Sequence, residues 1–425
     1  MRRRALAMSG LALGTLLRGD AVGGGLARVN TISPRAVGLG GAFGAVADDP
    51  SALHFNPAGL ASIYGRLVSI GLEYLNSQRT YTPTGEDGER LPSQSPNSSS
   101  TVVPSLGATF RTKEDGSWSR FAFGVGVWNS YGGQVSYDQL EDAQAPALNE
   151  TREVLLEMVG GVGYEASEYV SLGLALRLGI GLFHVDATNR PVTSDMSSTG
   201  FGVGLTGGLI LSNGLPSNGA GSARVGFTYR TPMTVATSGN ATMDLTGGPT
   251  DVDMDHEQQW PQSAALAVAW RPIARLLLAT QADWTDWERI NELTVEFPDR
   301  SELNQTFEMD WDSSYSLHLG ASVILTPSVE VSAGGSYDTR AVSKRTMERH
   351  NLDSNKFTAD AGAVVAVTER IKILGAVDVI LSSPVEVRNN TAEARDAGWI
   401  EWANKAPGTH EGRLITIELA AQYVF

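Results

Sequence analysis

The chain has 425 residues, 42% of them hydrophobic, and a mean hydropathy of −0.11, which excludes a disordered chain and a bundle of transmembrane helices. Its 32 basic and 47 acidic residues give a formal net charge of −15, which argues against a nucleic-acid partner because phosphate binding requires a basic surface. There is no cysteine, so disulfide scaffolds, thiolate metal sites and cysteine nucleophiles are excluded.

The N-terminus predicts a secretory signal peptide over residues 1–21. Residues 1–4 are basic, and residues 5–17 form an apolar stretch too short to span a bilayer. Small residues follow, and they bracket the cleavage site between residues 21 and 25. The alternative is a buried N-terminal helix. The signal-peptide interpretation places the mature chain outside the cytoplasm.

Residues 22–63 contain no strand pattern and are expected to fold as a separate small unit. Ser33-Pro34 and Asp49-Pro50 each combine a helix N-cap with proline at the first helical position, which predicts short helices. Pro57 disfavours the helical conformation at Asn56, so the second helix should end before it.

From about residue 65 onward, large apolar residues alternate with small or polar ones, and this period of two is typical of β-strands. In the clearest example, residues 170–182, valine, leucines and isoleucine occupy one face, whereas glycines, Ser171, Ala175 and Arg177 occupy the other. The pattern predicts fourteen strands, near residues 65–80, 100–112, 119–132, 151–165, 169–186, 199–212, 221–236, 259–271, 274–297, 308–326, 328–341, 355–368, 370–384 and 411–425.

The sizes of the side chains on the two faces separate a membrane barrel from a soluble sandwich. A sandwich fills its inner face with bulky side chains. A transmembrane barrel turns its bulky apolar side chains toward lipid and lines the lumen with small and polar groups. The connections also alternate between short turns and long polar loops, as in outer-membrane barrels. The sequence therefore predicts a 14-stranded antiparallel transmembrane β-barrel over residues 64–425, in the outer membrane of a Gram-negative bacterium.

Aromatic residues near the strand ends agree with this interpretation. Trp270, Trp284, Trp287, Trp311 and Tyr337 are expected in the girdles at the membrane interface. Residues 413–425 alternate and end on Phe425, which resembles the signal recognised by the barrel insertion machinery. Fourteen strands enclose a lumen that needs a filler, and residues 22–63 are the natural candidate for a helical plug, here called the hatch.

The hatch carries the most specific motifs of the sequence, Ala47-Asp48-Asp49 and Asn56-Pro57-Ala58. With Trp260-Pro261, Asp283-Trp284 and Trp311-Asp312 further along, nearly all of the mature chain resembles the FadL family, outer-membrane transporters of long-chain fatty acids and aromatic hydrocarbons. The resemblance implies a monomeric barrel plugged by the hatch, capture of apolar substrate at the extracellular loops, and a pocket that touches the mature N-terminus. It also implies lateral release into the membrane at a kinked third strand, with no cofactor and no energy coupling.

Candidate functional residues follow from these interpretations. The hatch motif comprises Asp48, Asp49, Asn56, Pro57 and Ala58, and ligand contacts are expected from Leu26, Val29 and Ile32 in the segment 24–32. Glycine permits a kink, so Gly132 and Gly133 are the candidates in the third strand; the alternative is that they are ordinary small residues of a glycine-rich barrel. Alternation points Arg177 into the lumen, where Gly179 and Gly181 should leave room for a substrate carboxylate; the alternative is pairing with another lumen side chain.

Two further patterns suggest other chemistry. The acidic segment 251–257 could attract calcium, but a solvated loop bridged to lipopolysaccharide is the simpler interpretation, and no resident metal is expected. His318 with Ser316 and Ser322 could suggest a hydrolase, but no acid partner follows by spacing, so no enzyme is predicted. The expected partners are a small hydrophobic ligand, outer-membrane lipid and lipopolysaccharide. The competing functions are a structural or secretion-associated scaffold and a polar-solute porin.

Overall fold

The computed structural model describes residues 32–85, 87–97, 99–112, 116, 118–137, 147–188, 194–245, 248–396 and 404–425. The predicted signal peptide and two of the predicted ligand contacts, Leu26 and Val29, lie outside the described residues. None of the described helices is long and apolar enough to cross a membrane.

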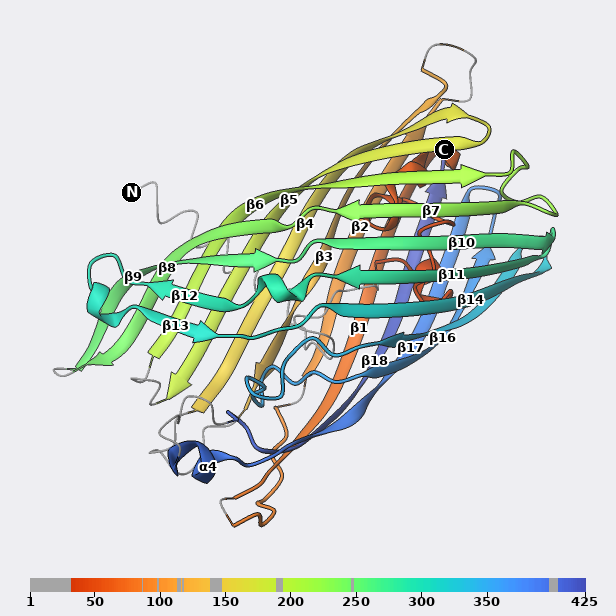
Figure 1. Ribbon diagram of the computed structural model, residues 1–425. Helices are drawn as coiled ribbons and strands as arrows, with labels where there is room; N and C mark the ends of the chain where they lie inside the picture. The colour runs from red at the N-terminus through yellow and green to blue at the C-terminus, as the bar shows by residue number, and fades with distance from the viewer. Residues whose placement is uncertain are drawn as a thin grey trace.

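Most of the chain forms one antiparallel sheet that closes on itself as a barrel of 14 strands, as predicted (Figure 1). The closure joins the first strand to the last over the whole of their length, from Leu67 opposite Val424 to Pro83 opposite Gly408. The barrel strands are β1 (Gly65–Pro83), β2 (Ser99–Arg111), β3 (Phe121–Ser136), β4 (Ala147–Ser167), β5 (Val170–Thr188), β6 (Ser194–Ser212), β7 (Ala223–Arg230), β10 (Ser263–Ile273), β11 (Leu276–Thr285), β14 (Ser314–Thr326), β15 (Val329–Asp338), β16 (Lys356–Ala366), β17 (Ile371–Val387) and β18 (Gly408–Val424).

Side-chain exposure follows the predicted alternation. On β5, Leu172, Leu174 and Leu176 are 45–52% exposed on the outer face, whereas Ala175 and Arg177 are buried. Large apolar side chains are exposed in the same way on β2, β6, β14 and β18. Such a band is stable only against lipid, because in water it would expose far more contiguous apolar surface than soluble proteins tolerate.

The long-loop end of the barrel, which is extracellular in outer-membrane barrels, is built differently from the prediction. The expected strand 221–236 is two strands, β7 and β8 (Met233–Leu245), both of which pair with β6. The break falls at Thr231-Pro232, where proline lacks the N–H needed for the ladder. β8 and β9 (Gly248–Trp260) form a long hairpin, where the sequence predicts a polar loop over 237–258 with part of a hairpin as the alternative. β9 also pairs with β12 (Glu292–Glu296). β12 and β13 (Gln305–Glu308) extend this extracellular sheet (Figure 1).

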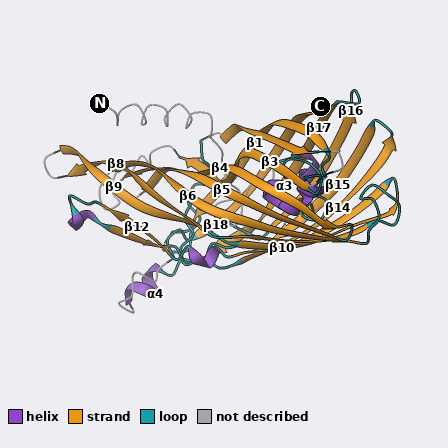
Figure 2. Ribbon diagram, turned by 90° about the horizontal axis from the view of Figure 1, so that it is seen from above, coloured by secondary structure: helices purple, strands orange, loops and turns teal. Residues whose placement is uncertain are grey.

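The remaining helices are short. The hatch contains α2 (Pro34–Val37), α3 (Ala52–Phe55) and the 3₁₀ helix η1 (Pro57–Ser62), and it lies inside the barrel (Figure 2). Two more 3₁₀ turns, η2 (Trp287–Arg289) and η3 (Ser301–Leu303), and helix α4 (Thr391–Asp396) belong to the long-loop end.

Local sequence explains how the hatch helices begin. Ser33 caps α2 by accepting the Arg35 N–H, with Pro34 at the first helical position, as predicted. Asn56 is extended, with φ −166° and ψ 103°, and caps η1 in the same way ahead of Pro57. At the second predicted start, α3 itself begins only at Ala52, but Asp49 accepts the Ser51 N–H at 2.8 Å ahead of the helix, as Ser33 does for Arg35, and the carbonyl of Asp49 accepts the Ala52 N–H.

The hatch backbone lies directly against the barrel wall where both carry glycine. A Cβ on Gly334 would lie 2.3 Å from the amide nitrogen of Gly40, and one on Gly320 would lie 2.3 Å from the carbonyl oxygen of Leu39. Gly40 itself has φ +65°, a conformation that favours glycine. The wall at β14 and β15 is therefore shaped to receive this one segment of the hatch.

Candidate functional site

The hatch motif forms two adjacent polar centres. In the first, Arg35 Nε donates to Asp48 Oδ1 at 2.7 Å, and Arg35 Nη1 donates to Glu330 on β15 at 3.0 Å. Burial alone would raise the pKa of Asp48, but the charge of Arg35 and its hydrogen bonds outweigh burial, and the pKa is lowered. The ion pair of Arg35 with Glu330 therefore joins the hatch to the wall.

The second centre is Asp49, whose two carboxylate oxygens accept hydrogen bonds from the hydroxyls of Ser33 and Ser51, both at 2.5 Å. Burial raises its pKa despite these bonds, and the neighbouring Asp48 raises it further. Asp49 thus joins the start of the hatch to α3 through hydrogen bonds within the hatch itself.

Asn56 joins the hatch to the opposite wall. Its side chain is fully buried, and Nδ2 donates to the carbonyl of Gly44 at 2.8 Å and to Leu209 on β6 at 3.2 Å. Pro57 and Ala58 pack where β5 and β6 carry Gly173 and Gly208. Asn56, Pro57 and Ala58 therefore join the hatch to one wall of the lumen, whereas Asp48 holds from within the hatch the Arg35 side chain that binds the other wall.

The third barrel strand is irregular at the predicted position. The β3–β4 ladder shifts register between Asn129 and Tyr131, and Gly132 follows with φ +143°, a conformation that strongly favours glycine. A Cβ at Gly132 would lie 2.5 Å from the carbonyl oxygen of Glu153. Gly133 pairs with Glu153 in the next position of the ladder.

A gap in backbone pairing accompanies this kink. Among the described residues, β2 and β3 pair only from Leu106–Val127 to Arg111–Ala122, and the part of β3 beyond Val127 pairs with β4 alone. At the end of the gap farthest from Val127, the backbone N–H of Asn97 donates to the Ser136 carbonyl at 2.7 Å and closes it. A small cavity lies at the other end of the gap, beside the Leu106–Val127 pair, and its lining residues include Ile32, Ser105 and Trp128. Of the predicted ligand contacts, Ile32 is thus placed beside the gap.

Arg177 does project into the lumen, but its guanidinium is engaged. Nη1 donates to Glu157 Oε1 at 2.8 Å, and Nη2 donates to the carbonyl of Thr231 at 2.5 Å. The space expected beside Gly179 and Gly181 is filled by Met233 and Val235. Arg177 therefore fits the alternative of pairing within the lumen, and its contact with a substrate stays a prediction.

Glu157 also links the kink to the hatch. It accepts from Ser130 in the irregular part of β3 and from Arg230 on β7, and Arg230 in turn contacts His54 Nδ1 in α3 at 3.1 Å. Sequence reasoning missed this buried cluster because its members come from four separate elements. The one sequence signal for this cluster is that each of its strand residues falls on the inward-facing side of its strand.

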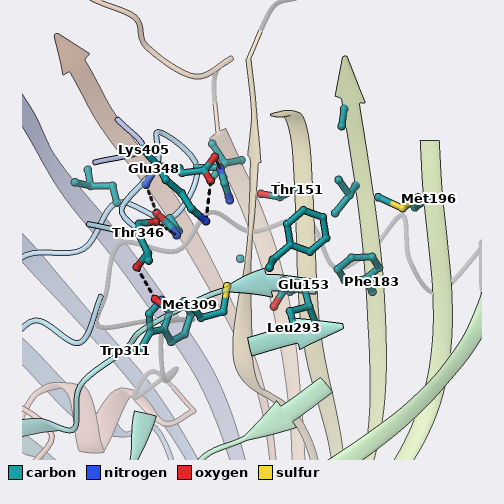
Figure 3. Close-up of a pocket in the computed structure, with 18 of the residues that line it drawn as sticks. Thr151, Glu153, Phe183, Met196, Leu293, Met309, Trp311, Thr346, Glu348 and Lys405 are labelled. Carbon is teal, nitrogen blue, oxygen red and sulfur yellow. Dashed lines mark hydrogen bonds and ion pairs between the residues drawn. The ribbon is translucent and has the colours of Figure 1, made fainter. Parts of the chain in front are cut away.

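A groove opens at the long-loop end and encloses about 1080 Å³ of space, including its open mouth (Figure 3). Its apolar lining comes from β5 and β6, from the β12–β13 hairpin with the residues that follow it, and from Leu352, and it includes Phe183, Met196, Leu293, Met309 and Trp311. One end is charged, where Lys405 lies 3.6 Å from Glu348. Gly133 lines the other side, so the groove reaches the kink in β3.

An aromatic cluster runs from the groove to the kink. Trp311 contacts Trp287 with ring centroids 5.7 Å apart, Trp287 contacts Tyr131 at 5.8 Å, and Tyr131 stacks on Trp260 at 5.3 Å. The prediction that Trp287 and Trp311 belong to an interface girdle is wrong, because both are buried in this cluster. Their position near strand ends could not separate a girdle facing lipid from a cluster facing the lumen.

The two other patterns noted in the sequence do not assemble a reactive site. His318 contacts the Gly40 carbonyl through Nδ1 at 2.7 Å and Asp283 through Nε2 at 3.5 Å, whereas Ser316 and Ser322 donate to Asp338 and Glu330. The carboxylates of residues 251–257 point outward along β9, not from a loop as expected. Within the described ranges, no group of three or more His, Asp or Glu side chains could hold a metal ion.

Comparison with known proteins identifies the architecture. The model of the family described as outer membrane protein transport protein (OMPP1/FadL/TodX) matches residues 20–425. The chain belongs to this family. It is thus related to outer-membrane transport proteins and not to enzymes. A search of the curated proteins finds no significant match.

Solved structures of FadL-type proteins share the fold. A FadL homologue of Pseudomonas aeruginosa superposes with a TM-score of 0.78 at 16% identity, covering 95% of this chain and 100% of its own. The toluene transporter TbuX of Ralstonia pickettii gives 0.67 at 16% identity, covering 92% and 98%. The toluene transporter TodX of Pseudomonas putida gives 0.66 at 15% identity, covering 92% and 97%. At these identities the likeness to FadL-type structures shows the fold alone.

Proposed function

We propose that this FadL-family chain is an outer-membrane channel for passive uptake of small hydrophobic molecules, long-chain fatty acids or aromatic hydrocarbons, with lateral release into the membrane. The observation that carries the proposal is the gap between β2 and β3. An apolar molecule that leaves through a barrel wall needs a place where the backbone ladder is already open, because breaking a ladder inside lipid leaves unpaired N–H and C=O groups at a cost of several kcal/mol.

The groove supports capture at the extracellular loops. It is lined mainly by apolar side chains, its mouth opens at the long-loop end, and it reaches Gly133 at the kink. Concave apolar sites with few polar groups are typical of pockets that bind small molecules. Substrate would pass from this groove along the aromatic cluster to the cavity beside Ile32, and then through the gap into lipid.

The hatch favours this function over a polar-solute porin. Hatch residues such as Leu39, Phe43, Leu53 and Leu60 are buried against the wall, and the ion pair of Arg35 and the bonds of Asn56 fix the hatch on two sides. A plugged barrel of this kind should be nearly silent in planar bilayers, whereas a porin should conduct ions. A scaffold should copurify with a protein partner and transport no ligand.

The proposal also includes the surroundings of the protein. The exposed apolar band fits outer-membrane lipid, with lipopolysaccharide around the long-loop end, and Phe425 directly follows β18, where it would serve as the signal for the barrel insertion machinery. We further propose that the protein acts as a monomer, since one barrel contains the groove, the hatch and the gap.

The direct test is uptake of labelled long-chain fatty acid and of toluene, side by side, in a Gram-negative strain that lacks its own transporter of this kind. Accumulation of either compound above that of the empty strain supports the channel and identifies its substrate class. Accumulation of neither, with the barrel correctly inserted, would contradict the proposal and favour the scaffold.

The exit route is tested by filling the cavity at the gap. Ser105 faces the lumen and lines that cavity, so Ser105→Trp should block the exit and reduce uptake at least tenfold. Ser100 is exposed on the outer face of the same strand, so Ser100→Trp is the matched control and should leave uptake unchanged. Equal uptake by the wild type and the Ser105→Trp variant would contradict lateral release at this gap.

A further inference from the structure

Glu153 places a carboxylate in the otherwise apolar part of the groove. It lies on the inward face of β4, between Gly133 on β3 and Phe183 on β5. Figure 3 shows it on the side of the groove formed by Phe183 and Leu293, away from Lys405 and Glu348. Thr151, two residues earlier on the same face, adds a hydroxyl to the same lining.

The other charged groups of the groove have partners. Lys405 Nζ donates to the Glu308 carbonyl at 3.2 Å and lies 3.6 Å from Glu348. Arg79 Nη1 donates to the carbonyl of His350 at 3.3 Å, and His350 Nδ1 lies 3.8 Å from Glu348. The basic groups of the groove are therefore already engaged, and none is offered to an incoming carboxylate.

Glu153 differs from these groups. In the part of the chain that the structure describes, its carboxylate makes no hydrogen bond and no ion pair, although it is more than half buried among apolar side chains. A carboxylate removed from water without a partner is costly, and the cost is relieved when a ligand supplies a hydrogen-bond donor. A ligand with its own carboxylate would add a like charge and increase the cost.

We propose that Glu153 is a specificity-determining residue of the groove, which selects apolar molecules that carry a neutral hydroxyl group, such as alkylphenols, over the corresponding hydrocarbons and carboxylates. The ligand hydroxyl donates to the Glu153 carboxylate while its apolar body lies against Phe183, Leu293 and Met309. This inference rests on the proposed function of the groove as the capture site.

Three probes that share one body and differ in one group test this assignment: butylbenzene, 4-butylphenol and 4-butylbenzoate. Their initial uptake rates are measured well below saturation in the strain without its own transporter. We expect the wild type to take up the phenol about tenfold faster than the hydrocarbon, the factor typical of one hydrogen bond to a charged group, and the benzoate slowest. The Glu153→Leu variant should lose the preference for the phenol and keep the rate for butylbenzene.

Two further variants sharpen the result. Glu153→Gln keeps an acceptor without the charge, so it should keep part of the phenol preference and raise benzoate uptake. Glu150→Leu removes the same charge three residues away on the opposite face of β4, where Glu150 accepts from Gln134 at 2.8 Å, and should leave all three rates unchanged.

The outcomes separate this inference from the function on which it rests. If the wild type takes up none of the three probes, and neither fatty acid nor toluene, faster than the empty strain, the proposed function fails. If it takes up fatty acid or toluene but none of the three probes, the function stands and the role of Glu153 is refuted. If it takes up butylbenzene but the ratio of phenol to hydrocarbon is the same in the wild type and in Glu153→Leu, the function stands and the role of Glu153 is refuted.

Discussion

Asn56 offers the sharpest test of whether the hatch seals the lumen. Its side chain is fully buried and makes three hydrogen bonds of 3.2 Å or less, to the Gly44 carbonyl, the Leu209 carbonyl and the Ala58 amide. Of its bonds, only those to the carbonyls of Leu209 at 3.2 Å and Phe227 at 3.4 Å reach the wall, so at about 1 kcal/mol net for each neutral hydrogen bond Asn56→Ala should weaken docking of the hatch by about 2 kcal/mol. This corresponds to an increase of roughly 30-fold in the ratio of undocked to docked hatch.

Single-channel recording in planar bilayers measures this ratio directly, because an undocked hatch opens the lumen to ions. Wild-type barrels should be nearly silent, and Asn56→Ala barrels should open much more often and also admit bulky antibiotics into cells. Asn213→Ala is the control, since Asn213 makes a similar set of backbone hydrogen bonds in the turn between β6 and β7, outside the lumen. An open probability equal to that of the wild type in correctly inserted Asn56→Ala barrels would refute the assignment of residues 32–63 as the seal.

Three more predictions concern the hatch and the wall that surrounds it. Gly334→Val should displace the hatch backbone and increase conductance, because even a Cβ there clashes, whereas Gly207→Val, with nothing within 4 Å of the position, should not. Asp48 has a pKa below its ordinary value, so its ion pair with Arg35 stabilises the docked hatch above about pH 4 and loses this effect as the pH falls through the lowered pKa. Conductance should therefore rise as the pH falls through that range. Asp48→Asn should remove this pH dependence. Glu157→Ala leaves two buried arginines without their carboxylate, so it should destabilise the barrel by about 3–5 kcal/mol, measured as a lower denaturant midpoint for unfolding in detergent.

The sequence alone predicted those features that depend on a single strand or on a few consecutive residues. Alternation along residues 170–182 separated the lipid-facing leucines from the buried Ala175 and Arg177, because successive side chains of any strand point to opposite faces. The caps at Ser33 and Asn56 were also readable, since a cap depends on the next few residues. Of the two glycines proposed for a kink, Gly132 has a positive φ, which is a local requirement, and Gly133 does not.

What the sequence left open depends on which strands become neighbours. Alternation along one strand can place Glu157 on the inward face, but its pairing with Arg177 and Arg230 exists only once β4, β5 and β7 surround the hatch. The β8–β9 hairpin was only the alternative to a loop, because outward carboxylates dominate residues 251–257, although Val252 and Met254 alternate with them on the buried face.

The sequence by itself thus determined the barrel, its number of strands, the lipid-facing side chains and the family, because these follow from a repeated local pattern and from short motifs. The tertiary structure alone decided where the β2–β3 ladder stops, what fills the space around Arg177, and which residues form the groove around Glu153. The physical reason is that a closed sheet brings together segments hundreds of residues apart, and their register and packing depend on all of the strands between them.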